Sequence, residues 1–165
     1  MKYKLTEETK ERFGRTLHRI VCVTAFSNVA AGELGGWIEN EKNLDQCGDA
    51  WVYGDALVCG NAEVYGNAKV YGDAEVCGNA CVYGDAWVYG DADYIVLKNN
   101  WSSGRYFTYT LSNKMWKVGC FFGTGEELIK KAYADSELSG RCYEASVKYV
   151  EELVRIKEGL KCKTE

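Results

Sequence analysis

The chain has 165 residues, of which 47% are hydrophobic, and a formal net charge of −4 at pH 7. This composition is too apolar for a disordered chain, and the length is enough to bury a core. The apolar runs are far shorter than the roughly 20 residues that span a bilayer, and the first residues lack the apolar stretch of a signal peptide. We therefore expect a cytoplasmic protein with no membrane partner.

The N-terminal segment, 1–33, predicts one or two strands with a turn near Phe13 and Gly14. We expect this segment to cap the one that follows it. The only histidine, His18, lies here in the strand-like run RTLHRIVCVTA, where a structural or solvated role is the simplest interpretation.

From Gln46 the sequence can be read in sixes: QCGDAW, VYGDAL, VCGNAE, VYGNAK, VYGDAE, VCGNAC, VYGDAW and VYGDAD. Each valine lies two residues after an alanine, so the two side chains point to the same side of a short strand. The Gly-Asp or Gly-Asn pair suits a corner, because both residues tolerate positive φ. Residues 34–93 therefore predict short strands wound around a small apolar interior.

This pattern resembles the hexapeptide-repeat proteins. The resemblance implies a left-handed parallel β-helix with three hexads per coil, and assembly as a homotrimer. We accordingly predict a mainly β fold: an N-terminal strand cap at 1–33, a β-helix at 34–93, and a C-terminal β-hairpin with α-helices at 94–165.

If three hexads form one coil, residues at equivalent positions three hexads apart stack on the same outward face. A solvent-exposed aromatic stripe normally marks an interface. We predict that one such face is the contact between subunits, while contact with the chain's own terminal segments and a ligand platform remain alternatives. The face consists of Trp51, Tyr53, Lys69, Tyr71, Trp87 and Tyr89.

Many hexapeptide-repeat proteins transfer acyl groups with a histidine as general base, yet the hexads contain no histidine. We therefore expect no catalytic residues and no enzyme, with an acyltransferase that uses His18 as an alternative. A single histidine and the absence of Cys-x-x-Cys spacing also argue against a metal site. No cofactor is expected.

After Asp93 the pattern changes to two strand-like runs, near 105–110 and 115–121, and then to helices. Thr124 and Glu127 have the spacing of a capping box, and a longer amphipathic helix is expected over about 137–157. The lead-in LGGWIENEKNL, the VYGDA repeats and the tail RYFTYTLSNKMWKVGCFFGTGEELIKKAY are similar to hexapeptide-repeat proteins that bacteriophages and prophages encode. That resemblance implies a setting rather than a chemistry.

Residues 94–123 carry four cations and no acid, whereas residues 35–93 have a net charge of −9. Cations that contact phosphate and aromatics that stack on bases are typical of nucleotide binding. We predict a phage-type oligomer that sequesters a small anionic, nucleotide-like ligand at a subunit boundary and so counteracts host defence. The candidate ligand residues are Arg105, Tyr109, Lys117, Lys114, Trp101, Tyr106 and Thr124.

Two other interpretations remain open for the C-terminal segment. Its basic face could dock on the acidic repeat, and the protein could be a purely structural or protein-interaction module. Duplex nucleic acid is not an expected partner, because the acidic repeat would repel phosphate.

Overall fold

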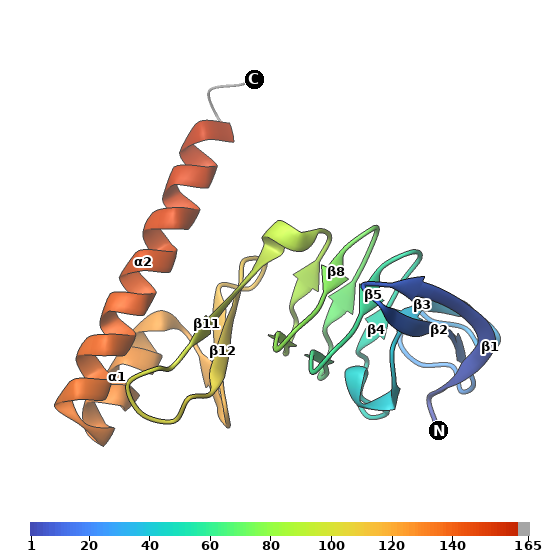
Figure 1. Ribbon diagram of the computed structural model, residues 1–165, viewed down its shortest axis with the longest axis horizontal. Helices are drawn as coiled ribbons and strands as arrows, with labels where there is room; N and C mark the ends of the chain where they lie inside the picture. Colours follow the sequence, from blue (N-terminus) through green and yellow to red (C-terminus); the bar gives the residue numbers. More distant parts are fainter. Residues whose placement is uncertain (162–165) are drawn as a thin grey trace.

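The computed structural model describes residues 1–161 and shows a mainly β protein with two helices at its C-terminal end (Figure 1). Its strands form four separate sheets. Within the described residues, neither helix is long and apolar enough to cross a membrane.

The N-terminal strands β1 (Tyr3–Arg12) and β2 (Arg15–Cys22) form an antiparallel hairpin. Its turn lies at Phe13 and Gly14, both with positive φ, as the sequence predicts. Strand β2 also pairs antiparallel with β3 (Leu34–Ile38), so the hairpin extends a sheet with the order β1-β2-β3-β5-β8.

In the repeat segment, residues 34–93, the strands from β4 to β10 have only two residues each. Strands separated by three hexads pair in parallel, for example Trp51 with Lys69 and Lys69 with Trp87. One sheet contains β4 (Trp51–Val52), β7 (Lys69–Val70) and β10 (Trp87–Val88). The others contain β5 (Leu57–Val58) with β8 (Glu75–Val76), and β6 (Glu63–Val64) with β9 (Cys81–Val82).

The predicted fold class, a left-handed parallel β-helix, is wrong for this chain. The structure is mainly β with several short, separate sheets, of which one is mixed and one is wholly antiparallel. The strands between the glycine corners have only two residues each, whereas the longer strands lie outside the hexads and pair antiparallel, which the hexad pattern does not predict. The N-terminal hairpin joins β3, β5 and β8 in one mixed sheet, and the C-terminal strands form a separate antiparallel sheet.

The core of the repeat segment consists of the small apolar side chains that the hexad pattern predicts. The valines and alanines point inward and pack with Ile20, Ile38 and Leu44. Each valine of this set is fully buried: Val52, Val58, Val64, Val70, Val76, Val82 and Val88.

The last strands of the repeat segment have backbone amides that side chains, rather than a further strand, satisfy. The Cys81 amide donates to the Thr108 hydroxyl at 3.0 Å, and the Trp87 amide donates to the Ser112 hydroxyl at 2.7 Å. The Glu75 amide donates to the Asp91 carboxylate at 2.8 Å. These contacts satisfy the amides at the edge of the parallel pairing. An edge with unsatisfied amides could otherwise pair with a strand of another chain.

The C-terminal unit follows the short helix η2 (Asp91–Asp93) and is an antiparallel sheet of four strands. These are β11 (Tyr94–Lys98), β12 (Tyr106–Thr110), β13 (Met115–Val118) and β14 (Phe121–Gly123). The expected hairpin is the middle pair, β12 and β13, so the prediction of an isolated hairpin is corrected to this larger sheet.

Two helices, α1 (Gly125–Asp135) and α2 (Glu137–Lys161), pack on this sheet. The predicted capping box is confirmed: the Thr124 hydroxyl accepts from the Glu127 amide, and the Glu127 carboxylate accepts from the Thr124 amide. Tyr143, Val147 and Val150 of α2 are buried against the sheet, and the helix continues away from the body (Figure 1).

The C-terminal sheet docks on the end of the repeat segment. The Lys117 ammonium lies over the rings of Tyr83 and Tyr65, 4.9 and 5.6 Å from their centroids. Phe122 packs edge-on against Tyr83, with ring centroids 4.7 Å apart. Part of the basic face that the sequence indicates is therefore used inside the molecule.

Candidate functional site

An acidic pocket lies on the outer face of the repeat segment, beside the short helix η1 (Glu41–Asn43) and β6. Asn43 fixes this helix: its buried side-chain amide donates to the Ala62 and Gly60 carbonyls at 2.8 and 3.1 Å. The next residue, Leu44, forms a parallel bridge with Val64. These contacts hold η1 beside β6, although β4 and β5 lie between them in the sequence.

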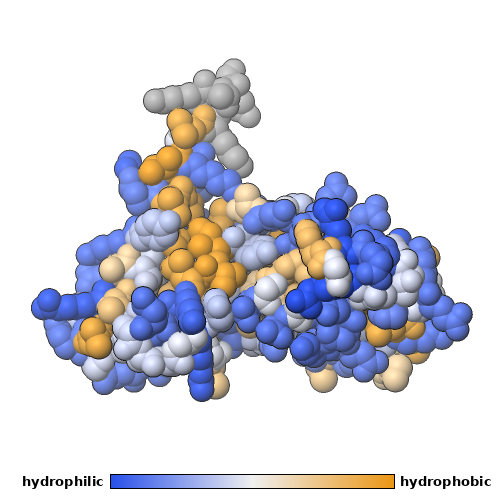
Figure 2. Space-filling model, viewed as in Figure 1, coloured by the Kyte–Doolittle hydropathy of each residue, from blue (hydrophilic) through white to orange (hydrophobic). Residues whose placement is uncertain are grey.

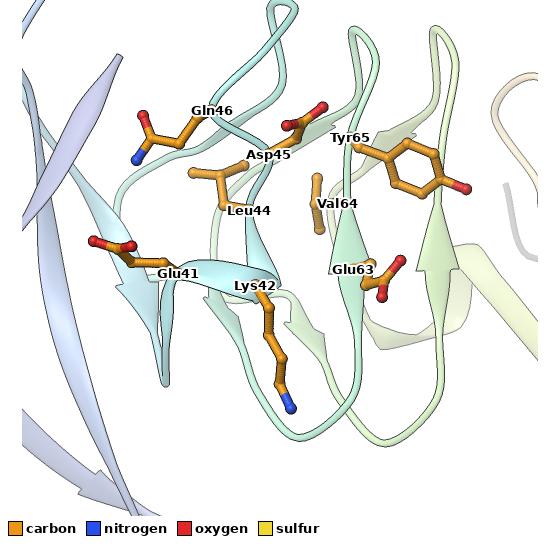
Figure 3. Close-up of a pocket in the computed structure, with 8 residues that line it drawn as sticks. All are labelled: Glu41, Lys42, Leu44, Asp45, Gln46, Glu63, Val64 and Tyr65. Carbon is orange, nitrogen blue, oxygen red and sulfur yellow. The ribbon is translucent and has the colours of Figure 1, made fainter. Parts of the chain in front are cut away.

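The acidic pocket has a volume of about 530 Å³ (Figure 3). Its charged residues are three carboxylates and one ammonium group, so the lining carries a net negative charge and favours a cationic ligand. Asp45 is partly fixed, because its carboxylate accepts from the Cys47 amide at 3.0 Å. The lining consists of Glu41, Lys42, Leu44, Asp45, Gln46, Glu63, Val64 and Tyr65.

Tyr65 forms the wall of the acidic pocket nearest to the C-terminal sheet. Its ring packs against Tyr83 at 4.4 Å, and its hydroxyl accepts from the Cys81 thiol at 3.2 Å. Burial raises the pKa of Tyr65 well above its usual value, and the contact with Cys81 adds to this effect. Tyr65 is therefore a neutral hydrogen-bonding group at physiological pH.

A second pocket, the junction pocket, lies where the C-terminal sheet, the start of α1 and the outer half of α2 meet. Its volume is about 500 Å³. It brings together three of the predicted ligand residues, Tyr109, Lys114 and Thr124. The other residues that line it are Trp116, Gly125, Glu126, Glu151, Val154, Arg155 and Glu158.

The junction pocket is less basic than the sequence suggests. Two cations, Lys114 and Arg155, face three carboxylates, and Arg155 is already paired with Glu152 at 2.6 Å. Burial raises the pKa of Tyr109, and the charges of Glu151 and Glu158 raise it further. Most of these acids come from α2, which the sequence does not indicate as part of the site.

The remaining predicted ligand residues lie outside the junction pocket. Trp101 belongs to the core of the C-terminal unit, with its ring 4.9 Å from that of Tyr143. Arg105 and Tyr106 are exposed, and Lys98 lies over the Tyr106 ring. Lys117 contacts the tyrosines of the repeat segment. The structure therefore does not gather the predicted ligand residues into one site.

The predicted interface face is divided. Trp51 is fully buried beneath the chain's own N-terminal segment, where it packs edge-on against Phe26 and Tyr3. Lys69 is also buried and donates to the Asp49 carbonyl. The outer part remains accessible: Trp87 and Tyr89 are 50% and 56% exposed. Contact with a terminal segment thus accounts for the inner part of this face.

Along the same face three tyrosine rings form a stack. The centroids of Tyr53 and Tyr71 are 4.5 Å apart, and those of Tyr71 and Tyr89 are 5.0 Å apart. Burial raises the pKa of Tyr53 to about 12. The assignment of this face as a subunit contact stays a prediction.

His18 is half-buried in β2, paired with Thr9 of β1 and Ile38 of β3. It lines neither the acidic pocket nor the junction pocket. The imidazole is therefore not placed to take a proton from a molecule bound in either pocket.

No family model matches this sequence. A protein of Escherichia coli (strain K12) named "Uncharacterized acetyltransferase YdcK" is 35% identical over 60 residues, which are 32% of this chain and 18% of that protein. The chain thus spans less than a fifth of the relative that it matches. The similarity gives some support to the hexapeptide-repeat resemblance, and it does not bear on a phage origin.

This comparison contradicts the prediction that the protein is not an enzyme, because the relative is named for a catalytic activity. The prediction rests on the absence of a histidine base from the hexads, but carboxylates can also act as general bases. Asp45 and Glu63 occupy equivalent positions three hexads apart and therefore belong to one outward face.

Proposed function

We propose that the protein is an acyl-transfer enzyme of the acetyltransferase type, and that the acidic pocket holds the acceptor. The observation that carries the proposal is the similarity to a protein named an acetyltransferase. The acidic pocket supports it, because an amine acceptor is a cation before it reacts, and Glu41, Asp45 and Glu63 attract such a group.

The chemistry assigns the proton to a carboxylate. The bound ammonium first loses one proton to solvent, because only a neutral amine has the lone pair that reacts. The neutral nitrogen then attacks the carbonyl carbon of an acetyl thioester, a C–N bond forms, and the C–S bond breaks. The nitrogen proton passes to the carboxylate and then to the departing thiolate. Glu63 is the better candidate for this base, because its side chain is exposed, whereas Asp45 accepts a backbone amide.

The test measures thiol release from acetyl-coenzyme A in the presence of a panel of primary amines and alcohols. We expect release above the blank with an amine acceptor, and Glu63→Gln should lower the rate by about 10²-fold or more, as for the loss of a general base. Glu126→Gln, a carboxylate of the junction pocket, is the matched control and should leave the rate unchanged. Release no faster than the blank with every acceptor would contradict the proposal.

His18→Ala separates the two candidate bases. Our proposal expects this variant to keep the parent rate. If His18→Ala abolishes transfer while Glu63→Gln retains it, the acceptor does not lie in the acidic pocket.

A second candidate function is the binding of a small ligand in the junction pocket. Tyr109, Lys114 and Thr124, chosen from the sequence, line the same cavity, and the start of α1 adds amides that favour an anionic group. We propose a ligand with an aromatic ring and a single anionic group that contacts Lys114, because the three carboxylates of this pocket would repel a second anionic group. Under this proposal the ligand is nucleotide-like, and the protein binds it in the cytoplasm. The protein would then belong to a phage and counteract host defence.

Heating the purified protein and analysing the released small molecules tests the second candidate. A nucleotide panel should raise the melting temperature of the parent and not that of Lys114→Ala. Lys117→Ala, whose ammonium lies over tyrosines instead, should behave as the parent. Equal responses of parent and Lys114→Ala would remove this candidate.

A further inference from the structure

Helix α2 presents apolar side chains, most of them on its outer half, that no other part of the described chain covers. Figure 2 shows apolar side chains along this helix as it leaves the body. Its large members are between 38% and 60% exposed, although leucine and isoleucine are normally buried. We name this set the α2 stripe: Leu138, Tyr149, Leu153, Ile156 and Leu160.

The spacing of the α2 stripe is that of a helix that packs against another helix. Tyr149, Leu153, Ile156 and Leu160 follow one another at intervals of four, three and four residues, the alternation of a heptad seam. Leu138 precedes Tyr149 by about three helical turns and therefore lies on the same side. At 1.5 Å per residue the seam from Tyr149 to Leu160 is about 17 Å long, and Leu138 lies about 17 Å before it.

The stripe is distinct from the face by which α2 packs on its own sheet. That inner face consists of Tyr143, Val147, Val150 and Val154, each six residues before a member of the seam. Six residues at about 100° each place the two faces about 120° apart around the helix. One helix thus has two apolar faces, and the chain's own core covers only the inner one.

The charges beside the stripe favour a second copy of α2 as the partner. In the heptad frame Leu153 and Leu160 take position a and Ile156 position d, so Glu152 is at g and Lys157 at e. Between two parallel identical helices, g of one chain meets e of the next heptad in its partner, five residues on. Glu152 and Lys157 are five residues apart and opposite in charge, whereas antiparallel helices would place like charges together.

Lys157 is available for this contact. Its ammonium donates to the Ala92 carbonyl at 2.8 Å, which uses one of its three protons. Glu152 is exposed and contacts Arg155 at the surface, a pair of small energetic value.

We propose that the α2 stripe is an interface between copies of this chain, in which the α2 helices associate in parallel. The apolar seam supplies the driving force, and the pairing of Glu152 with Lys157 of a partner fixes the direction. Leucine at a with isoleucine at d favours more than two helices in such a bundle. The proposal is independent of the acyl-transfer reaction.

Sedimentation of the parent at about 100 μM should give a mass at least twice the 18.5 kDa of one chain. Leu153→Lys/Ile156→Lys should reduce the mass to that of one chain while the circular dichroism and melting profile show that it folds. The matched control is Phe13→Lys/Val23→Lys, two exposed apolar residues of the N-terminal segment, which should keep the parent mass. A monomeric parent, or an assembly that Leu153→Lys/Ile156→Lys leaves intact, would overturn the proposal.

Charge exchange tests the direction of the helices. Glu152→Lys and Lys157→Glu should each weaken the assembly by roughly tenfold or less in dissociation constant, and the double exchange should restore it. If the double variant assembles no more tightly than the single variants, the parallel arrangement is wrong.

Discussion

Lys2 is a buried cation whose hydrogen-bond partners are carbonyls rather than carboxylates. Its ammonium donates to the carbonyls of Ala50 at 2.9 Å and of Cys47 and Gly48 at 3.4 Å. Burial lowers the pKa of Lys2 to about 8, and the negative charge of Asp45 only partly opposes this effect. The folded protein therefore holds the Lys2 proton less tightly than the unfolded chain does.

The pH dependence of stability follows from this difference. Between about pH 8 and the unfolded value of 10.5 the unfolded chain binds more protons at this site, so stability rises with pH in that window. We expect the melting temperature of Lys2→Met to rise less from pH 8 to 10 than that of the parent. Lys4→Met, at an exposed position two residues later in β1, should follow the parent. Parallel curves for parent and Lys2→Met would contradict the assignment.

Some side chains could be placed from the sequence and others could not. The inward valines and the Thr124 cap follow from spacing along a few residues, which is why the sequence predicts them. The burial of Trp51 depends on Phe26 and Tyr3 folding back over it, and the position of Lys117 depends on docking between segments. Contacts of this kind leave no local pattern in a single sequence.

At the scale of single elements, the last strands of the repeat segment show how side chains can satisfy the backbone amides of a strand edge. Thr108 is 1% exposed and accepts the Cys81 amide, so its hydroxyl replaces a ladder carbonyl. The sequence predicts only a hairpin for the sheet that provides Thr108. It does not reveal strands β11 and β14, because YIVLK and FFG are short apolar runs without clear alternation.

Removal of this hydroxyl should be measurable. Thr108→Val keeps the shape of the side chain and leaves a buried amide without a partner, so we expect a loss of about 1–3 kcal/mol in unfolding free energy. Thr16→Val, on the exposed N-terminal hairpin, should change it by less than about 0.5 kcal/mol. Denaturant titration of both variants gives the comparison, and equal stabilities would mean that Thr108 does not protect the strand edge.

At the scale of the whole molecule, one glycine reports on how the C-terminal sheet docks. Gly84 and Gly78 are both corner glycines with a φ of +73°. A Cβ at Gly84 would lie 2.6 Å from the Phe122 ring, whereas a Cβ at Gly78 would meet no atom within 4 Å. The backbone cost of a methyl group is therefore the same at both positions, and only the docking contact differs.

We expect Gly84→Ala to be less stable than Gly78→Ala, by about 1–3 kcal/mol, as for overpacking of a well-packed contact. Gly84→Ala/Phe122→Ala removes the clash and should recover part of the difference. The measurement is denaturant unfolding of the three variants. Equal stability of the two single variants would show that Phe122 does not lie against Gly84.

The tyrosine stack has an optical consequence. Aromatic rings fixed in an asymmetric packed environment give circular dichroism in the near ultraviolet, and these rings are stacked at interplanar angles of 9° and 13°. Tyr53, Tyr71 and Tyr89 directly follow β4, β7 and β10, so their contribution depends on the packing of these three strands. The near-ultraviolet circular dichroism of the unlabelled protein can therefore follow the packing of β4, β7 and β10.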